Sequence, residues 1–200
     1  GAQSSLITLP ATHTTADLTS LSMRLRHDLG ITGGGEGNPV DAWNSTGGGT
    51  INFTGAGGSR PLQRVTNQRI DFDGSDDTMT SAQTVGTLIG GDATGWFMCG
   101  RMRGTTTNAA VGYSTSDGIL IDSGGYFGLL IAQIDASNLK LVFYGYDAAS
   151  GGTVHLQSTG GATPANGTIL KNTIFYWDLR HDGTTVTMGI NGVDVHSLAL

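Results

Sequence analysis

The chain has 200 residues, a length that all-β sandwiches commonly reach around one hydrophobic core. Ten lysines and arginines stand against sixteen acidic residues, a formal net charge of −6, so the basic face of a nucleic-acid-binding protein is not expected. Only 13% of the residues are charged, whereas 38% are hydrophobic and 33 are glycine, which excludes a highly charged disordered chain and favours strands and turns.

We expect no targeting signal in the N-terminal segment. It begins Gly1-Ala2-Gln3 without a basic stretch ahead of an apolar one, and the chain contains no run of about 18 apolar residues, so we expect no membrane insertion. We interpret the missing initiator methionine as the mark of a processed, tagged or excised N-terminus. Residues 1–20 mix isolated apolar residues with Thr and Ser, and we predict an extended arm there, with a frayed terminus as the alternative.

The first strand signal lies between Leu21 and Leu29, where apolar and polar residues alternate with a period of two. Glycine clusters follow and mark loops, because glycine adopts positive φ without steric cost. Trp43 and Phe53 stand among these glycines. We predict that both aromatic side chains anchor the loops to the core.

A short strand is predicted for residues 69–74, with Ile70 and Phe72 facing inward. The Asp73-Gly74 pair is typical of a tight turn, so we expect this strand to form a hairpin with residues 78–80.

The middle of the chain predicts several further strands. Residues 95–103 place apolar side chains on both faces, which is typical of a central strand covered by another layer on each side. Cys99 is the only cysteine, which excludes an internal disulfide, and we predict a buried structural thiol. Residues 118–122, 126–134 and 139–146 follow as strands at short spacing. No window keeps a 3.6-residue apolar period, so we expect little or no helix.

The C-terminal region gives the clearest pattern. Residues 175–180, 185–190 and 193–195 alternate in hydrophobicity and are joined at Asp182-Gly183 and Asn191-Gly192. Such pairs suit type I′ turns, whose twist matches that of the strands they connect. We predict a three-stranded meander that buries six or seven large side chains and forms a main part of the core.

In these motifs the chain resembles the concanavalin A-like lectin and glucanase domains, which include the laminin G-like domains. The C-terminal half of that family typically carries an aromatic strand, then Asp-Gly-Thr as at residues 182–184, then an apolar strand and Asn-Gly-Val as at residues 191–193. Residues 25–32, 40–43 and 70–77 are similar to its bacterial and phage members. The resemblance implies an all-β, two-sheet antiparallel sandwich in jelly-roll order, spanning residues 21–200 as a single domain.

Members of that family bind glycans, mediate adhesion, hydrolyse polysaccharides or serve as scaffolds, so the fold alone does not define the function. Its glucanases need two glutamates about 5 Å apart. Here Glu36 is the only glutamate, so we expect no enzymatic activity. A remote alternative is an aspartate-based hydrolase that uses the carboxyl groups of Asp71, Asp73, Asp76 and Asp77.

The same four aspartates are candidate ligands for Ca²⁺, which prefers carboxylate oxygens. The alternative is that Asp73 forms the turn while Asp76 and Asp77 cap nearby backbone amides. The five histidines lack the short spacings of a zinc site.

Aromatic side chains beside Asp residues are candidates for glycan binding. This set, near loops and strand ends, comprises Tyr113, Asp117, Tyr126, Tyr144, Tyr146 and Asp147. The alternative for the tyrosines is that they seal a sheet edge.

Two function classes remain open. The first is a non-catalytic, lectin-like recognition module that binds a glycan or cell-surface polysaccharide, placed on a phage virion or tail or on a bacterial surface. The second is a structural decoration or assembly domain that contacts other virion subunits, with the N-terminal arm as a route to a homo-oligomer. Both predict an extracellular or virion-surface location.

Overall fold

The computed structural model contains β-strands and no α-helix among the residues that it describes. Those are residues 23, 25–46, 51–73, 76–83, 95–105, 118–122, 127–147, 152–159 and 167–199, with residues 118–122, 146–147 and 152–155 described by their backbone alone. They fall into two compact units, one within residues 5–88 and one within residues 89–200. The predicted arm at residues 1–20 lies outside the described residues.

The N-terminal unit holds two small antiparallel sheets, of order β1-β2-β3 and β4-β5. Their strands are β1 (Ile31–Gly33), β2 (Val40–Asn44), β3 (Asn52–Thr54), β4 (Leu62–Arg64) and β5 (Arg69–Asp71). Val40 and Ile51 are buried at 0% and 3% exposure. Trp43 is half-buried and donates its indole N–H to the carbonyl of Arg26 at 2.7 Å, so it holds the turn at residues 26–29.

Two predictions for this unit are wrong. Arg26 and Leu29 form an isolated bridge around a turn, so the described part of the segment 21–29 is not a core strand. The predicted partner of β5 is also wrong, because β5 pairs with β4 through the turn at residues 65–68, and Thr80 bridges to Thr54 instead. Phe72 is 49% exposed and does not face inward. β1, β2 and β3 lie where the glycine clusters predicted loops, so alternation did not identify them, and it does not specify strand partners either.

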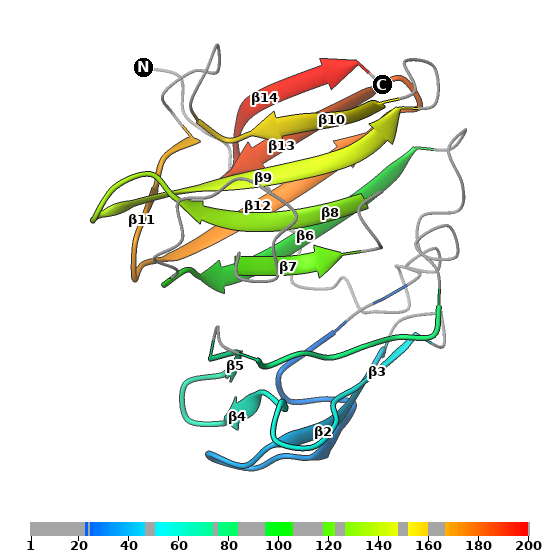
Figure 1. The fold of residues 1–200 in the computed structure, drawn as a ribbon, viewed down its shortest axis with the longest axis vertical. Helices are drawn as coiled ribbons and strands as arrows, with labels where there is room; N and C mark the ends of the chain where they lie inside the picture. Colours follow the sequence, from blue (N-terminus) through cyan, green and yellow to red (C-terminus); the bar gives the residue numbers. More distant parts are fainter. Residues whose placement is uncertain are drawn as a thin grey trace, which may run out of the picture. The chain divides into compact units, whose positions relative to one another are not determined.

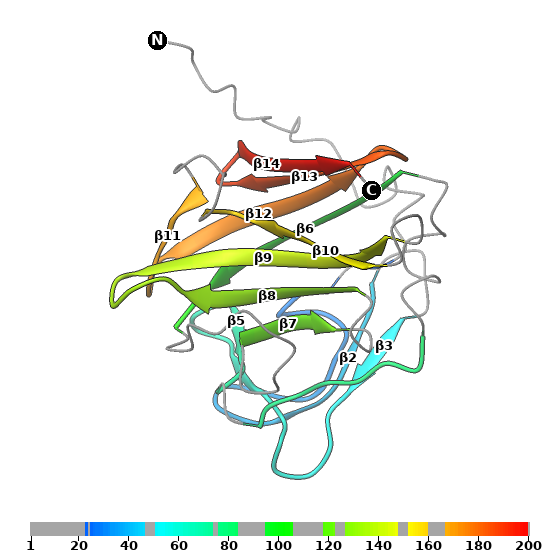
Figure 2. The ribbon, with the colours of Figure 1, turned by 45° about the horizontal axis from the view of Figure 1, so that its top comes forward.

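The C-terminal unit is a sandwich of two antiparallel sheets. One has the order β10-β9-β8-β7, with β11 beside β9, and the other has the order β14-β13-β12-β6. Figures 1 and 2 show the first sheet, yellow-green, lying across the second, which runs from green β6 to red β14. The strands are β6 (Trp96–Arg103), β7 (Gly118–Asp122), β8 (Phe127–Gln133), β9 (Asn138–Asp147), β10 (Gly152–Gln157), β11 (Ile169–Leu170), β12 (Ile174–His181), β13 (Thr185–Ile190) and β14 (Val193–Ala199). The all-β, antiparallel sandwich prediction is confirmed.

Aromatic rings join the two sheets at one end of the core. Trp96 of β6 lies 5.8 Å from Phe127 and 6.0 Å from Phe143, between ring centroids, and the two phenylalanines lie 5.2 Å apart in an edge-to-face arrangement. Such pairs add to the free energy gained by burying the rings. At the other end a Cβ atom on Gly104 would meet Ile131 and Leu139, so the sheets approach closely there too.

The C-terminal meander is confirmed. β12 pairs with β13 and β13 with β14, and Asn191 and Gly192 have φ of 52° and 80°, the positive values that a type I′ turn requires. Seven large side chains of the meander are at most 7% exposed: Phe175, Trp177, Leu179, Val186, Met188, Ile190 and Val195.

The prediction of a central strand over residues 95–103 is wrong in one respect. β6 is a strand, but it pairs only with β12 among the described strands and so forms the edge of its sheet. Its inner face carries Trp96, Met98 and Met102, whereas every second residue is exposed. Cys99 lies on the exposed face, so the prediction of a buried thiol is also wrong. An apolar run with a period of two does not show whether its second face is covered.

The described residues contain no helix long and apolar enough to cross a membrane. Both sheets of the sandwich lie in the C-terminal unit, and the prediction of one domain over residues 21–200 stays a prediction.

Candidate functional site

An acidic loop follows β5 in the N-terminal unit. Carboxylate oxygens of Asp73, Asp76 and Asp77 lie within 4.8 Å of one another. Ser59 donates its hydroxyl to Asp76 at 2.9 Å, and the backbone N–H of Asp73 donates to Asp77 at 2.7 Å. Oxygens bound to one Ca²⁺ each lie 2.3 to 2.6 Å from the ion, so about 5 Å is the largest separation allowed between two of them. The three carboxylates therefore fit as part of a calcium ligand set.

The charges of this loop are not fully balanced. Partial burial raises the pKa of the Asp77 carboxyl above its usual value, and the like charges of Asp73 and Asp76 raise it further, while the hydrogen bond from the Asp73 amide acts in the opposite direction. Removing charge from Asp77, by protonation or by a bound cation, would relieve this repulsion.

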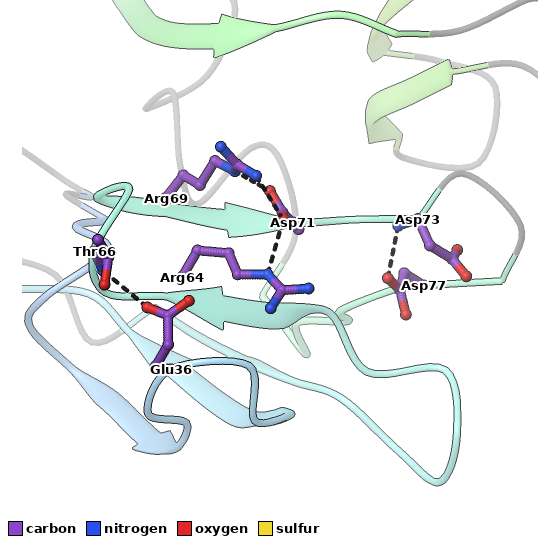
Figure 3. Close-up of polar contacts among 7 residues, drawn as sticks. All are labelled: Glu36, Arg64, Thr66, Arg69, Asp71, Asp73 and Asp77. Carbon is purple, nitrogen blue, oxygen red and sulfur yellow. Dashed lines mark hydrogen bonds and ion pairs between the residues drawn. The ribbon is translucent and has the colours of Figure 1, made fainter.

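Asp71, the fourth predicted calcium ligand, pairs with arginines and does not belong to the cluster of Asp73, Asp76 and Asp77. Its carboxylate accepts two hydrogen bonds from Arg69, one from Nε and one from Nη2 at 3.1 Å. It accepts a third from Arg64 Nε at 3.2 Å (Figure 3). The Arg69 contact, followed by that of Arg64, holds the Asp71 pKa below its usual value. The carboxylate thus ties the two strands of the β4–β5 hairpin together.

Glu36 also has a structural contact. Its carboxylate accepts the backbone N–H of Thr66 at 2.9 Å, in the turn between β4 and β5 (Figure 3). That hydrogen bond lowers the pKa of Glu36, which favours its ionised form. An acid for glycoside hydrolysis needs the opposite shift, so the only glutamate of the chain has the properties of a turn cap.

A second candidate is a polar pocket in the C-terminal unit, at the turn between β8 and β9. Its volume is about 390 Å³ and its lining comprises Gln133, Ile134, Asp135, Asn138, Lys140, Thr159 and Thr168. β10 pairs with β9 from Val142 onward, and β11 pairs with Asn138 and Leu139 of the same strand. Ser158, fully buried, joins these segments by accepting from the Leu141 amide and donating to the Gly167 carbonyl.

The turn beneath the pocket is held by Asp135. Its carboxylate accepts the backbone N–H groups of Ser137 and Asn138 at 2.8 and 2.9 Å, and both its oxygens accept from the Asn138 side chain. The Asn138 side chain, then the Ser137 amide, lowers the Asp135 pKa. The carboxylate is therefore ionised and oriented.

Two other groups of the pocket retain binding capacity. Lys140 Nζ donates to the amide oxygen of Gln157 at 2.9 Å and pairs with no described carboxylate. Thr159 is only 9% exposed, and its hydroxyl makes no hydrogen bond with the described part of the chain. This hydroxyl is free to donate to or accept from a bound hydroxyl group.

The tyrosines predicted to bind glycans do not form one described site. Tyr113, Asp117 and Tyr126 lie outside the described residues, and Tyr146 and Asp147 are described by backbone alone, paired with β10. These five stay predictions.

Tyr144 does not fit the predicted role. It is 2% exposed and belongs to a buried cluster with Leu130, Ala132 and Val142. Its ring lies against Gly128, where a Cβ atom would be only 2.0 Å from the ring. A ring packed in this way has no open face for stacking on a sugar.

Comparison with known proteins finds no match to a family model, to a curated protein or to a solved structure. The pocket was not predicted, because its residues lie in four separate segments of the sequence. One signal was present: polar Gln133, Asn138 and Lys140 interrupt two apolar strands close to their shared turn.

Proposed function

We propose that this protein is a non-catalytic recognition module that binds carbohydrate, with a concanavalin A-like jelly-roll arrangement, and that it acts on a phage virion or tail or on a bacterial surface. The observation that carries the proposal is the polar pocket beside the β8–β9 turn. It offers a donor in Lys140, an ionised acceptor in Asp135, and the hydroxyl of Thr159, which has no hydrogen-bond partner among the described residues.

This set of groups suits a sugar. Each sugar hydroxyl both donates and accepts, so it is bound best where donors and acceptors alternate. Ile134, 44% exposed, adds an apolar surface for the C–H groups of a ring. The charges of Lys140 and Asp135 balance, which favours a neutral saccharide in this pocket.

A glycan array, read with Ca²⁺ and with a chelator, tests the proposal. The carboxylates of Asp73, Asp76 and Asp77 would hold the ion. Glycan binding that is lost with the chelator would show that a calcium ion is required for it. Affinities of array hits are then measured by calorimetry for Lys140→Gln and Thr159→Val, with Lys171→Gln as the control outside the pocket.

We expect each pocket variant to lose about two- to tenfold in affinity, the effect of one hydrogen bond. The Lys171 variant should bind normally. No hit on the array under either condition, or equal affinities for all three variants, would contradict the proposal.

A structural assembly domain is the alternative. It is favoured by three exposed apolar side chains on the outward face of β6 and β12: Phe97, Ile174 and Tyr176. Light scattering on the same preparations addresses it. A monomer at every concentration would contradict self-assembly through this face.

A further inference from the structure

The outward face of β6 and β12 carries the two arginines for which the described residues provide no counter-ion. Five other arginines pair with aspartates, whereas no described carboxylate pairs with Arg101 or Arg103. The chain as a whole is acidic, with a formal net charge of −6, so two neighbouring guanidinium groups without a described carboxylate partner are unusual and indicate a binding surface.

The strand register places these arginines beside exposed apolar side chains. Arg101 lies directly opposite Tyr176, and Arg103 opposite Ile174. Tyr176 is 58% exposed and Ile174 is 53% exposed. Direct neighbours in an antiparallel pair have Cβ atoms about 5 Å apart, and alternate residues of one strand are about 7 Å apart. The four side chains therefore form one continuous patch, which we call the β6–β12 face.

The acidic groups of this sheet face are occupied elsewhere. Arg180 binds Asp178 at 2.8 Å through Nε and also binds Asp194 of β14. The two carboxylates next to the patch thus bind a different arginine, and these three groups together carry a net charge of −1. Arg101 and Arg103 keep their positive charge available for a partner.

We infer that the β6–β12 face binds an acidic polysaccharide, with the two guanidinium groups on uronate carboxylates and Tyr176 and Ile174 against the sugar rings. Arginine binds carboxylates through two parallel hydrogen bonds, and apolar side chains cover the C–H surface of a sugar. This site is separate from the polar pocket and does not depend on it.

Nucleic acid is a less suitable partner for the same face. Its charge density is far higher than that of a uronate polymer, and an acidic protein with two unpaired cations on the face would repel most of it. An acidic peptide would satisfy the arginines, but it lacks the ring surfaces that Tyr176 and Ile174 match.

Cys99 provides a direct measurement of occupancy. It is the only cysteine of the chain, it is exposed, and it lies two residues before Arg101 on the same face of β6. The rate of its alkylation by iodoacetamide, followed by mass spectrometry, is measured with increasing polygalacturonate. Dextran, oligothymidylate and polyglutamate serve as comparison polymers.

Polygalacturonate should slow the alkylation of Cys99, and added salt should restore the rate because salt screens the charges. Arg101→Gln and Arg103→Gln should each raise the polymer concentration that gives half-maximal protection about tenfold. This is the effect of losing one charge-assisted hydrogen bond. Lys171→Gln, which removes a charge elsewhere on the same unit, should leave it unchanged.

Three outcomes would overturn the inference. These are an unchanged alkylation rate with polygalacturonate, equal protection by dextran, and stronger protection by oligothymidylate or polyglutamate than by polygalacturonate. Circular dichroism of the arginine variants confirms that they fold, and the wild-type result decides the question without them.

Discussion

Single aspartates have opposite roles in the two units. Asp135 and Asp182 each accept two backbone amides in turns. The Asn138 side chain and the Ser137 amide lower the pKa of Asp135, and the amides of Thr184 and Thr185 lower that of Asp182. Asp77 differs, because burial and its acidic neighbours raise its pKa. Turn-capping carboxylates therefore stabilise the fold when ionised, whereas the charge on Asp77 opposes folding.

The substitution Asp77→Asn tests this assignment. A carboxyl with a raised pKa binds protons more tightly in the folded state, so the free energy of unfolding falls as pH rises from below the usual aspartate value through the raised pKa. Asparagine keeps an acceptor for the Asp73 amide without the charge. We expect the variant to be at least as stable as the parent at neutral pH and to lose this pH-dependent component, in thermal melts with a chelator.

Asp135→Asn is the matched control with the opposite sign. Because the Asp135 pKa is lowered, its contribution is present above the usual aspartate value and is lost as pH falls through the lowered pKa. This variant should be less stable than the parent at neutral pH and equal to it in strong acid. A loss of stability in Asp77→Asn at neutral pH would contradict the assignment for Asp77.

At the scale of the strand, β8 and β9 are buried on both faces. Leu129, Ile131 and Phe143 point toward the other sheet, and the alternate residues Leu130, Val142 and Tyr144 are equally buried. The sequence shows this as nearly continuous apolar runs, which predicted the strands correctly. It did not indicate that Tyr144 packs over Gly128, because a tyrosine looks the same in a sequence whether it is exposed or buried.

The packing of Tyr144 on Gly128 gives a prediction for β8. In Gly128→Ala the new methyl group would lie about where the Tyr144 ring now is. We expect a loss of about 1–3 kcal/mol in the free energy of unfolding, as for other overpacked cores. Urea denaturation measures it.

The same change in a Tyr144→Leu background should cost less, since the ring that causes the clash is gone. Gly58→Ala is the control, because nothing lies within 4 Å of its Cβ position. If both glycine variants were equally stable, Tyr144 would not be packed on β8.

At the scale of the molecule, the sandwich depends on apolar side chains from both sheets. Leu179 of β12 is fully buried, with Met188 of β13 and Met98 of β6 as its neighbours in the sheet. Leu179→Ala should reduce the free energy of unfolding by about 2–5 kcal/mol through lost burial and the cavity left behind.

Leu170→Ala is the comparison for the whole-molecule prediction. Leu170 is 58% exposed, and exposed substitutions usually change stability by no more than about 0.5 kcal/mol. The two variants are compared by calorimetry. Similar melting temperatures would show that β12 does not contribute to the core.

The sequence alone determined the all-β class, the C-terminal meander and its tight turn at Asn191-Gly192. These are local properties: alternation of apolar side chains, and the positive φ that Asn191-Gly192 adopts, act between residues adjacent in the chain. The absence of helix from the described segments followed from the same local patterns.

Only the tertiary structure decided which strands pair and which faces remain open. The pairing of β5 with β4, the edge position of β6 and the exposure of Cys99 depend on contacts between distant segments. The pocket around Lys140 and Thr159 and the patch around Arg101 and Tyr176 arise in the same way. A period of two places a side chain on one side of its strand, but the rest of the fold determines whether that side is covered.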